Sequence, residues 1–222
     1  MKQQRAPLTL LIATRNLHKV EEIRAILGGR FSFLTLKDFP NAPNVVEDAA
    51  TFSGNATKKA AHLERWLSMN GPARKSKPDF VLADDSGLEV DALDGAPGVH
   101  SARFAGVETG ANGNAKDGDN VSKLLRLLRG VQAAKRTARF RCVVALVSTE
   151  MKSNRRLPQL FGGVCEGRIT LKPRGTGGFG YDPVFKPDGY SKTFGELGED
   201  VKNKLSHRAK ALEKMREWLG YV

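Results

Sequence analysis

Two adjacent acidic residues follow a short apolar segment near the middle of the chain. Residues Phe80–Ala83 predict a buried strand, and Asp84 and Asp85 follow it, ahead of the turn-favouring pair Ser86-Gly87. Neighbouring residues of an extended chain point to opposite faces, so one carboxylate can face a site while the other bonds the turn. Such a carboxylate can bind Mg²⁺ and accept a proton from water. The segment alone is equally compatible with a turn that has no catalytic role.

A second polar segment, residues 14–19 (TRNLHK), lies between an expected strand at Leu8–Ala13 and an expected helix that ends at Gly28-Gly29. Backbone N–H groups at a helix N-terminus attract anions, and Lys19 adds a full positive charge. The segment therefore predicts a phosphate-binding loop, with a helix start capped by Asn16 as the open alternative. The patterns GxxxxGK[ST] and GxGxxG after a strand are absent from the sequence, which argues against ordinary P-loop and Rossmann proteins.

Two later segments carry weaker signals. Residues 175–183 (GTGGFGYDP) contain four glycines and two aromatic residues. Glycine lets the backbone approach a ligand closely, and an aromatic ring can stack on a planar base, but such segments are also ordinary connectors. The triplet Ser206-His207-Arg208 begins an expected C-terminal helix, where Ser206 can act as the N-cap.

The segments around these motifs predict an α/β protein. Apolar spacing indicates helices from Thr51 to Leu67, over residues 124–131 and at the C-terminus, and strands at Phe140–Leu146 and within Leu160–Leu171. The polar segment Gly106–Asp119 is typical of a mobile surface loop. Strands that alternate with helices favour a mixed sheet with helices on both sides, and 222 residues with 40% apolar content suffice for a sizeable core.

Composition leaves several classes of partner open. The net charge of +12 suits a nucleic acid, an anionic small substrate or a basic solvated surface. Cys142 and Cys165 show no CxxC spacing, which argues against a disulfide framework or a zinc site and favours a reducing cytoplasm. No apolar segment approaches the roughly 20 residues of a membrane span, so we expect no membrane association.

Together and in order, these motifs resemble the inosine triphosphate pyrophosphatase (HAM1) family. The resemblance extends from residues 13–19 and 51–60 through 83–106 (ADDSGLEVDALDGAPGVHSARFAG) and 175–185 to 196–208. It implies one ITPase-like α/β domain over residues 1–222, with residues 1–7 as a flexible tail. The implied fold is an elongated mixed sheet flanked by helices, with two lobes around a central cleft, usually assembled as a homodimer.

The resemblance also implies an activity and the residues that perform it. The activity is Mg²⁺-dependent hydrolysis of deaminated purine nucleoside triphosphates (ITP, dITP and XTP) to the monophosphate and pyrophosphate, which cleanses the nucleotide pool. Asp85 would be the catalytic acid and, with Glu47, a metal ligand. Substrate contacts are implied at Thr14, Arg15, Asn16, Lys19, Asn55, Lys59, Ser86, Phe179, Gly180, Tyr181, Asp182, Lys202, His207 and Arg208.

Base selection has a simple chemical form under this interpretation. Hypoxanthine and xanthine carry a 6-oxo acceptor where adenine carries an amino donor. Donors from His207 and Arg208 aimed at that edge would favour the oxo group, by ~10⁴ or more in favourable cases. Phe179 would stack on the base.

The chain departs from the family pattern at two positions. Gly54 stands where the family usually has Glu, and with Thr51 as the N-cap this position is N3, so the chain lacks a capping box. Arg15 replaces a commonly small residue and would contact either phosphate or solvent.

Two rival functions remain. A broad NTP pyrophosphatase of the Maf type would differ in base selectivity. A non-catalytic nucleic-acid-binding protein would bind with strong salt dependence, but it has no use for carboxylates such as Asp85 and Glu47 in a cleft. We therefore expect no specific nucleic-acid partner.

Overall fold

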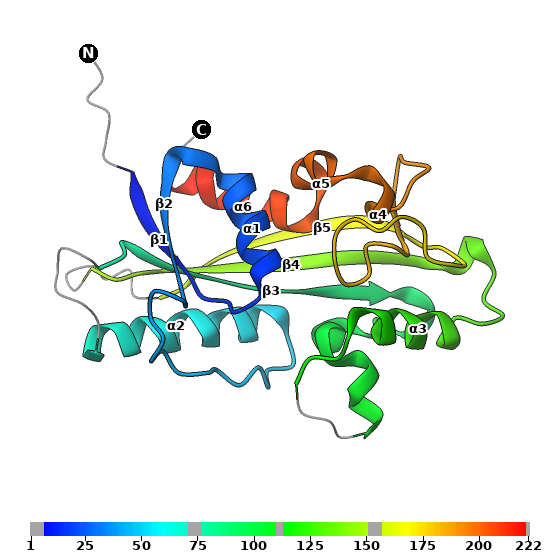
Figure 1. Ribbon diagram of the computed structural model, residues 1–222, viewed down its shortest axis with the longest axis horizontal. Coiled ribbons are helices and arrows are strands. Elements are labelled where there is room, and N and C mark those ends of the chain that lie inside the picture. The colour runs from blue at the N-terminus through cyan, green and yellow to red at the C-terminus, as the bar shows by residue number, and fades with distance from the viewer. Residues whose placement is uncertain (1–6, 71–76, 110–112, 151–156, 221–222) are drawn as a thin grey trace, which may run out of the picture. The chain divides into compact units, whose positions relative to one another are not determined.

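The strands of the chain form one mixed sheet. A computed structural model describes residues 7–70, 77–109, 113–150 and 157–220. The sheet order is β2-β1-β3-β4-β5-β6, with β1 parallel to β2 and β3, and β5 antiparallel to β6 (Figure 1). The bounds are β1 (Leu8–Ile12), β2 (Phe31–Thr35), β3 (Phe80–Val90), β4 (Thr137–Ser148), β5 (Gln159–Ile169) and β6 (Phe185–Pro187). The predicted α/β class with a mixed sheet is confirmed.

Helices alternate with strands from β1 to β4, after which β5 and β6 follow directly and three helices end the described chain. The helices are α1 (Leu17–Leu27), α2 (Phe52–Asn70), α3 (Asp117–Leu127), α4 (Phe194–Leu197), α5 (Glu199–Leu205) and α6 (His207–Trp218). Short 3₁₀ segments are η1 (Gly28–Arg30), η3 (Asp91–Leu93), η4 (Gly98–Thr109) and η5 (Ala133–Lys135). In the part of the chain that is described, no helix combines the length and apolar character needed to cross a membrane.

The chain divides into two compact units. Unit 1 comprises Met1–Asp85, Val143–Phe161 and Leu212–Val222, and unit 2 comprises Ser86–Cys142 and Gly162–Ala211. Strands β3, β4 and β5 contribute residues to both units because the chain passes from one unit to the other within them. Residues 1–6 of the predicted N-terminal tail lie outside the described residues.

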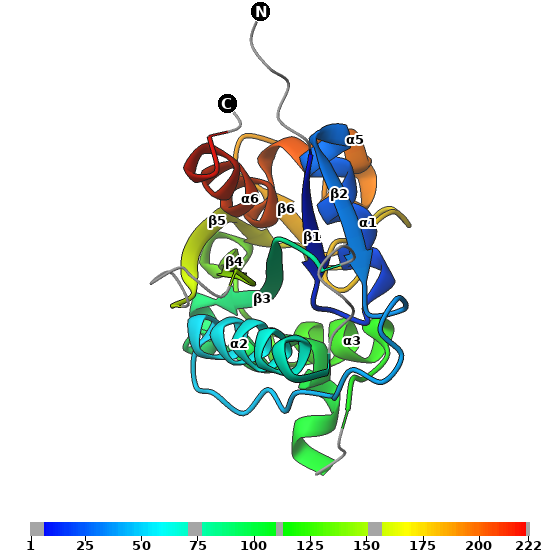
Figure 2. The ribbon, with the colours of Figure 1, turned by 90° about the vertical axis from the view of Figure 1, so that its left-hand side faces the viewer.

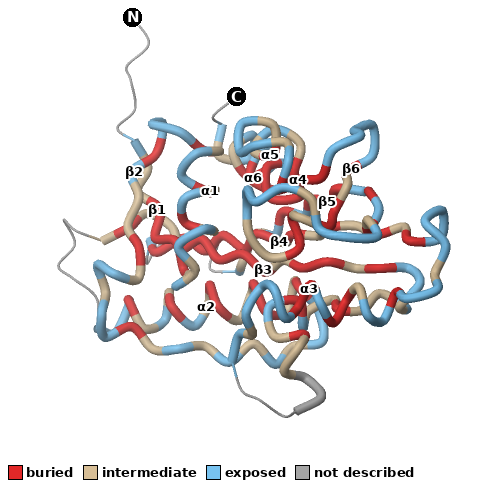
Figure 3. The backbone as a smooth tube through the Cα atoms, turned by 45° about the vertical axis from the view of Figure 1, so that its right-hand side comes forward, coloured by how far each residue is buried: buried red, intermediate tan, exposed pale blue. Residues whose placement is uncertain are grey.

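Unit 1 is built around two parallel strand pairs and the long helix α2. The last three residues of β1, Leu10 to Ile12, are fully buried, as expected for a strand inside the sheet. The predicted apolar face of α2 is buried too, and the tube in Figure 3 shows buried positions recurring along this helix. The hydrophobic core cluster of unit 1 comprises Leu11, Ala13, Ala42, Ala56, Ala60, Leu63, Leu67, Val81, Ala83, Ala145 and Val147. Figure 2 looks along α2 and shows β1, β2 and α1 beside one another.

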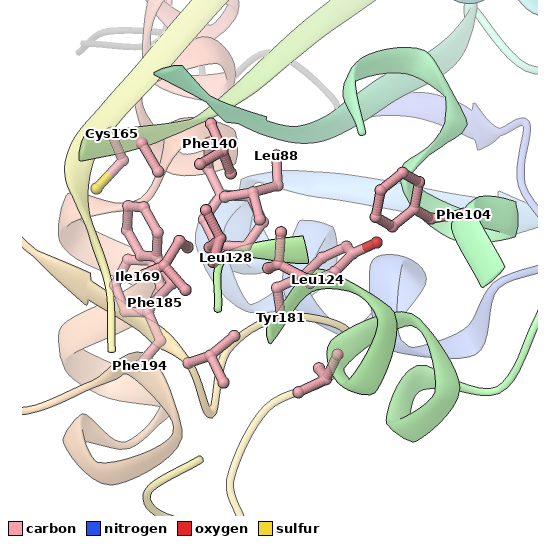
Figure 4. Close-up of a cluster of buried hydrophobic side chains, with 14 residues drawn as sticks. Leu88, Phe104, Leu124, Leu128, Phe140, Cys165, Ile169, Tyr181, Phe185 and Phe194 are labelled. Carbon is pink, nitrogen blue, oxygen red and sulfur yellow. The ribbon is translucent and has the colours of Figure 1, made fainter. Parts of the chain in front are cut away.

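Unit 2 has its own core of aromatic and aliphatic side chains. Phe140 of β4 packs against Phe185, with ring centroids 4.6 Å apart, and Phe185 stacks on Phe194. Figure 4 shows these rings together with side chains from β3, α3 and β5. This core fixes the segments that lead into and out of residues 175–185.

Several predicted boundaries were wrong. Strand β3 does not end at Ala83; it continues through Asp84 and Asp85 to Val90, with no turn at Ser86-Gly87. Leu88 and Val90 are fully buried, so sheet pairing and burial outweigh the turn propensity of the polar residues. Both acidic residues therefore lie inside a strand.

Other differences concern loops and short elements. The predicted loop Gly106–Asp119 is partly helical, because η4 extends to Thr109 and α3 begins at Asp117; residues 110–112 lie outside the described residues. The C-terminal helix is two helices, α5 and α6, separated at Ser206. Strands β2 and β6 were not predicted, although the alternation in Phe31–Thr35 is a usable signal.

Candidate active site

Asp85 is the centre of a buried polar cluster in unit 1. The Asn55 Nδ2 atom donates to Asp85 Oδ2 at 3.1 Å, and Lys59 Nζ lies 3.5 Å from Asp85 Oδ1. The same Nζ atom lies 3.0 Å from Glu47 Oε2. Asn55 and Lys59 are one turn apart on α2 and face the same side, as their spacing predicts. The structure thus brings together four of the residues that the sequence singled out.

Burial governs the protonation of this cluster. Burial raises the pKa of Asp85 to about 6, and Glu47 adds to this effect, while Lys59, Lys19 and the Asn55 amide oppose it. Burial also lowers the pKa of Lys59, but the carboxylates of Asp85, Asp84 and Glu47 outweigh it and the pKa is raised. Lys59 therefore stays an ammonium ion, and Asp85 is a stronger base than an exposed aspartate.

The loop after β1 contributes a second ion pair. Lys19 Nζ lies 3.1 Å from Asp84 Oδ2, and the Asp84 side chain is fully buried. Asn16 caps α1, since its Oδ1 accepts from the Lys19 N–H at 3.2 Å, and Thr14 Oγ1 accepts from the Asn16 N–H. The capping interpretation is confirmed. A lysine ammonium has three donors, so Asp84 can orient Lys19 without using all of them.

The Asp84 partnership was missed at the sequence level, where one carboxylate of the pair was expected to bond a turn. Adjacent residues of a strand face opposite sides, and Asp84 and Asp85 accordingly take different lysine partners. Because both residues are extended, their side chains point to opposite faces, and each carboxylate lies beside a different lysine.

Arg15 is exposed, and its side chain also bonds another segment of unit 1. Its Nε donates to Asn44 Oδ1 and its Nη2 donates to the Ala42 carbonyl, both at 2.9 Å. The side chain thereby reaches the segment between β2 and α2 that carries Glu47.

The start of α2 explains how the chain accommodates Gly54. Thr51 is the N-cap as predicted, since its Oγ1 accepts from the Gly54 N–H at 3.1 Å. A Cβ atom at position 54 would lie 2.7 Å from the Ala49 Cβ, well inside van der Waals contact. The Ala49 N–H in turn donates to Asn55 Oδ1 at 2.9 Å. Glycine at position 54 thus lets the Glu47 segment pack closely on the helix.

The chemistry of these donors fits a magnesium ion. Among the described residues, no group of three or more His, Cys, Asp or Glu side chains is arranged to hold a metal. Magnesium, however, is commonly bound by one or two carboxylates, with water and substrate phosphates completing its shell. Glu47 and Asp85 supply such a pair, and both already converge on one cationic group, the Lys59 ammonium.

In unit 2, Asp182 organises the glycine-rich segment. Its Oδ2 accepts from the Phe179 N–H at 2.8 Å and from Lys202 Nζ at 2.6 Å, and both charged side chains are almost fully buried. Lys202 Nζ also lies 4.5 Å from the centroid of the Phe179 ring, within cation–π range. Lys202 and Asp182 thus hold the ring expected to stack on a base.

The glycines of this segment serve the chain's own packing more than was expected. A Cβ at Gly175 would collide with the Gly195 carbonyl, and one at Gly178 would collide with the Asp182 carboxylate. Both residues also have positive φ, at 76° and 73°. These two glycines are needed for internal contacts, so they are not evidence of a ligand.

Gly180 and Tyr181 are likewise tied to their own unit. The Gly180 N–H donates to Asp117 Oδ2 at 2.6 Å, a contact at the start of α3 that the sequence did not reveal. The Tyr181 hydroxyl donates to the Ser101 carbonyl at 2.9 Å. Burial, and then the charge of Asp117, raises the pKa of Tyr181, so it remains a neutral donor. These residues shape the segment from within.

Arg208 and His207 are buried at the start of α6. Arg208 is 1% exposed, and its Nη2 donates to Ser86 Oγ at 2.9 Å. His207 stacks on Phe140 with ring centroids 4.8 Å apart and planes 10° from parallel. Ser206 Oγ accepts from the Ala209 N–H at 3.2 Å, which confirms the predicted cap. Ser86, the residue after Asp85, thus contacts the arginine expected to recognise the base.

An α/β fold with a buried carboxylate, a second carboxylate and two lysines beside a helix N-terminus defines an enzyme suited to phosphate chemistry. The chain belongs to the Ham1 family, whose model matches residues 10–218.

Individual relatives match over almost the whole chain. A dITP/XTP pyrophosphatase of Halalkalibacterium halodurans is 45% identical over 210 residues, which cover 94% of this chain and 97% of that protein. One from Geobacter sulfurreducens is 46% identical over 213 residues, 96% of each chain. The HAM1 protein of Coxiella burnetii has a TM-score of 0.78 at 36% identity and covers 97% of this chain and 100% of its own. The Staphylococcus aureus Ham1 protein has a TM-score of 0.76 at 31% identity, with 96% and 98% covered.

Proposed function

We propose that this chain hydrolyses deaminated purine nucleoside triphosphates, ITP, dITP and XTP, to the nucleoside monophosphate and pyrophosphate. The single observation that carries the proposal is the buried Asp85, bonded by Asn55 and paired with Lys59 beside Glu47. The dITP/XTP pyrophosphatases to which the chain is similar support the same reaction. The reaction removes damaged nucleotides from the pool.

Lys19 and Lys59 bind the triphosphate in this proposal. A triphosphate carries about four negative charges, and these repel an anionic nucleophile, so the site must neutralise them before water can attack. Both ammonium ions are held in place by carboxylates, Asp84 and Glu47 respectively. The N–H groups at the start of α1, after Thr14, add a favourable helix dipole.

Glu47 and Asp85 would hold the metal ion, which we propose to be Mg²⁺. When bound, it would supply Lewis-acid polarisation of a phosphoryl oxygen and lower the pKa of water. The residues of the chain orient the two carboxylates, and burial desolvates Asp85. Asn55 fixes the Asp85 oxygen, and the Lys59 ammonium keeps Glu47 and Asp85 together.

Asp85 also accepts the proton of the attacking water. With a pKa of about 6 it is mostly ionised at neutral pH, yet it is a better base than an exposed aspartate. Its position inside β3 fixes its backbone, and the Asn55 bond restricts the carboxylate.

The base would stack on Phe179, and Arg208 and His207 would present donors to its 6-oxo edge. Lys202 and Asp182 hold the Phe179 backbone and ring, and Ser86 bonds Arg208. The amino group of adenine is itself a donor, so it would leave the buried donors of the protein without an acceptor. Such a mismatch discriminates strongly against ATP.

The test is a comparison of nucleotides under one condition. We expect kcat/KM for ITP, dITP and XTP, measured as pyrophosphate release with Mg²⁺, to exceed that for ATP by ~10³ or more. Equal values for all nucleotides would refute the base selectivity and favour a Maf-type enzyme. Absence of turnover together with salt-dependent binding to DNA or RNA would favour a nucleic-acid-binding protein.

We further propose that the chain acts as one domain, as a homodimer, in the cytoplasm. Three strands run through both units, which supports a single domain. Among the described residues, Cys142 and Cys165 are both buried and are not joined in a disulfide, which fits a reducing compartment. Light scattering coupled to size exclusion tests the dimer, and a monomer at micromolar concentration would refute it.

A further inference from the structure

The segment between β2 and α2 carries Glu47 but has no regular structure. Residues 36–51 form neither helix nor strand, so their position depends on bonds to the rest of unit 1. Glu47 itself is 38% exposed at its side chain, unlike the buried Asp85. A carboxylate on such a segment is useful only if the segment is held on both sides of it.

The C-terminal side of the segment is held by α2. The Ala49 N–H donates to Asn55 Oδ1, and Lys58 Nζ lies 2.6 Å from Asp48 Oδ1. These contacts come from the helix that also carries Lys59, and they anchor the two residues that follow Glu47.

The N-terminal side is held by Arg15. Its guanidinium donates through Nε to Asn44 Oδ1 and through Nη2 to the Ala42 carbonyl, both at 2.9 Å. Ala42 is itself buried in the unit 1 core. A guanidinium presents its donors in a rigid fork. Two bonds to one segment therefore fix the orientation of that segment as well as its distance from the arginine.

We propose that Arg15 is a positioning residue that locks the Glu47 segment onto the loop after β1, so that Glu47 is held ready beside Asp85 and Lys59. Arg15 acts through Glu47 and does not bind phosphate. This inference rests on the proposed function only for the role of Glu47, because the anchoring itself is a property of the protein without substrate.

The experiment combines Arg15→Met with Glu47→Gln in a double-mutant cycle. Methionine keeps an unbranched apolar stem but removes all donors. In the wild-type background we expect kcat to fall ~10-fold, the Mg²⁺ concentration for half-maximal rate to rise by a similar factor, and the nucleotide KM at saturating Mg²⁺ to change little. In the Glu47→Gln background Arg15→Met should have no further effect. Arg15→Lys should recover only part of the loss, since lysine lacks the fork.

A second readout does not depend on activity. Hydrogen–deuterium exchange of peptides within residues 36–51, measured without metal or nucleotide, should be faster in Arg15→Met and in Asn44→Ala than in the wild type. Arg24→Met is the matched control, because it removes the same charge from a nearby position on α1, where the Arg24 guanidinium lies 6.0 Å from the centroid of the Phe33 ring. It should leave the exchange of this segment and the Mg²⁺ dependence unchanged.

The outcomes separate the inference from the proposed function. Unchanged exchange in Arg15→Met, an equal loss of activity with and without Glu47, or a loss confined to nucleotide KM would each overturn the role of Arg15. Faster exchange in a chain that hydrolyses no nucleotide would support the anchoring and refute the proposed function instead.

Discussion

Replacing Asp85 by asparagine should stabilise the folded chain while removing most of its activity. Burial raises the pKa of Asp85 from 3.8 to about 6, so the folded state binds this proton more tightly than the unfolded chain does. The group costs little stability below about pH 4, and the cost develops between about pH 4 and 6, where the unfolded chain loses this proton and the folded chain keeps it. A difference of about 2 units corresponds to about 3 kcal/mol at most. We expect Asp85→Asn to be ~1–3 kcal/mol more stable at neutral pH.

The assay is urea unfolding monitored by circular dichroism, carried out in EDTA near pH 4.5 and near pH 7.5. The stability gain of Asp85→Asn should be complete at the higher pH and clearly smaller at the lower one, while pyrophosphate release falls by ~10³ or more. Asp48→Asn is the control: its pKa is lowered by the Lys58 hydrogen bond and charge, so its replacement should bring no stability gain at neutral pH. A variant that is less stable than wild type at neutral pH, or a gain independent of pH, would refute the reasoning.

Three further substitutions test other parts of the site. Asp182→Ala removes the carboxylate that holds a buried lysine ammonium, so urea unfolding should show a loss of ~3 kcal/mol. Ser86→Ala removes the acceptor of Arg208 and should lower kcat/KM for ITP ~10-fold with little change for ATP; equal losses would contradict a role in base recognition. Gly54→Ala should destabilise the chain by ~1–3 kcal/mol despite better helix propensity, because its Cβ would crowd Ala49, and adding Ala49→Gly should recover the loss; a stabilised single variant would contradict this.

Elements with a clear apolar period were predictable from sequence. The face of α2 and the alternation of β4 follow directly from where the core lies, and the caps at Asn16, Thr51 and Ser206 depend only on residues within one turn. The continuation of β3 through Asp84 and Asp85 was not predictable in this way. Polar residues there favour a turn locally, and only pairing within the sheet decides against it.

The identities of site residues were more predictable than their partners. The motifs named Lys19, Arg15 and Arg208, but local sequence does not specify that these contact Asp84, Asn44 and Ser86, because those contacts join residues far apart in the chain. The same limit applies to Gly175, whose close neighbour is the Gly195 backbone. The cleft between two lobes stays a prediction.

The most direct test of the central claim is the identity of the products. We predict that ³¹P NMR of ITP incubated with the chain and Mg²⁺ shows the monophosphate and pyrophosphate accumulating in equal amounts, and that Asp85→Asn abolishes both signals. Accumulation of the diphosphate with orthophosphate, or unchanged turnover by the variant, would contradict cleavage of the α–β phosphoanhydride by a site centred on Asp85.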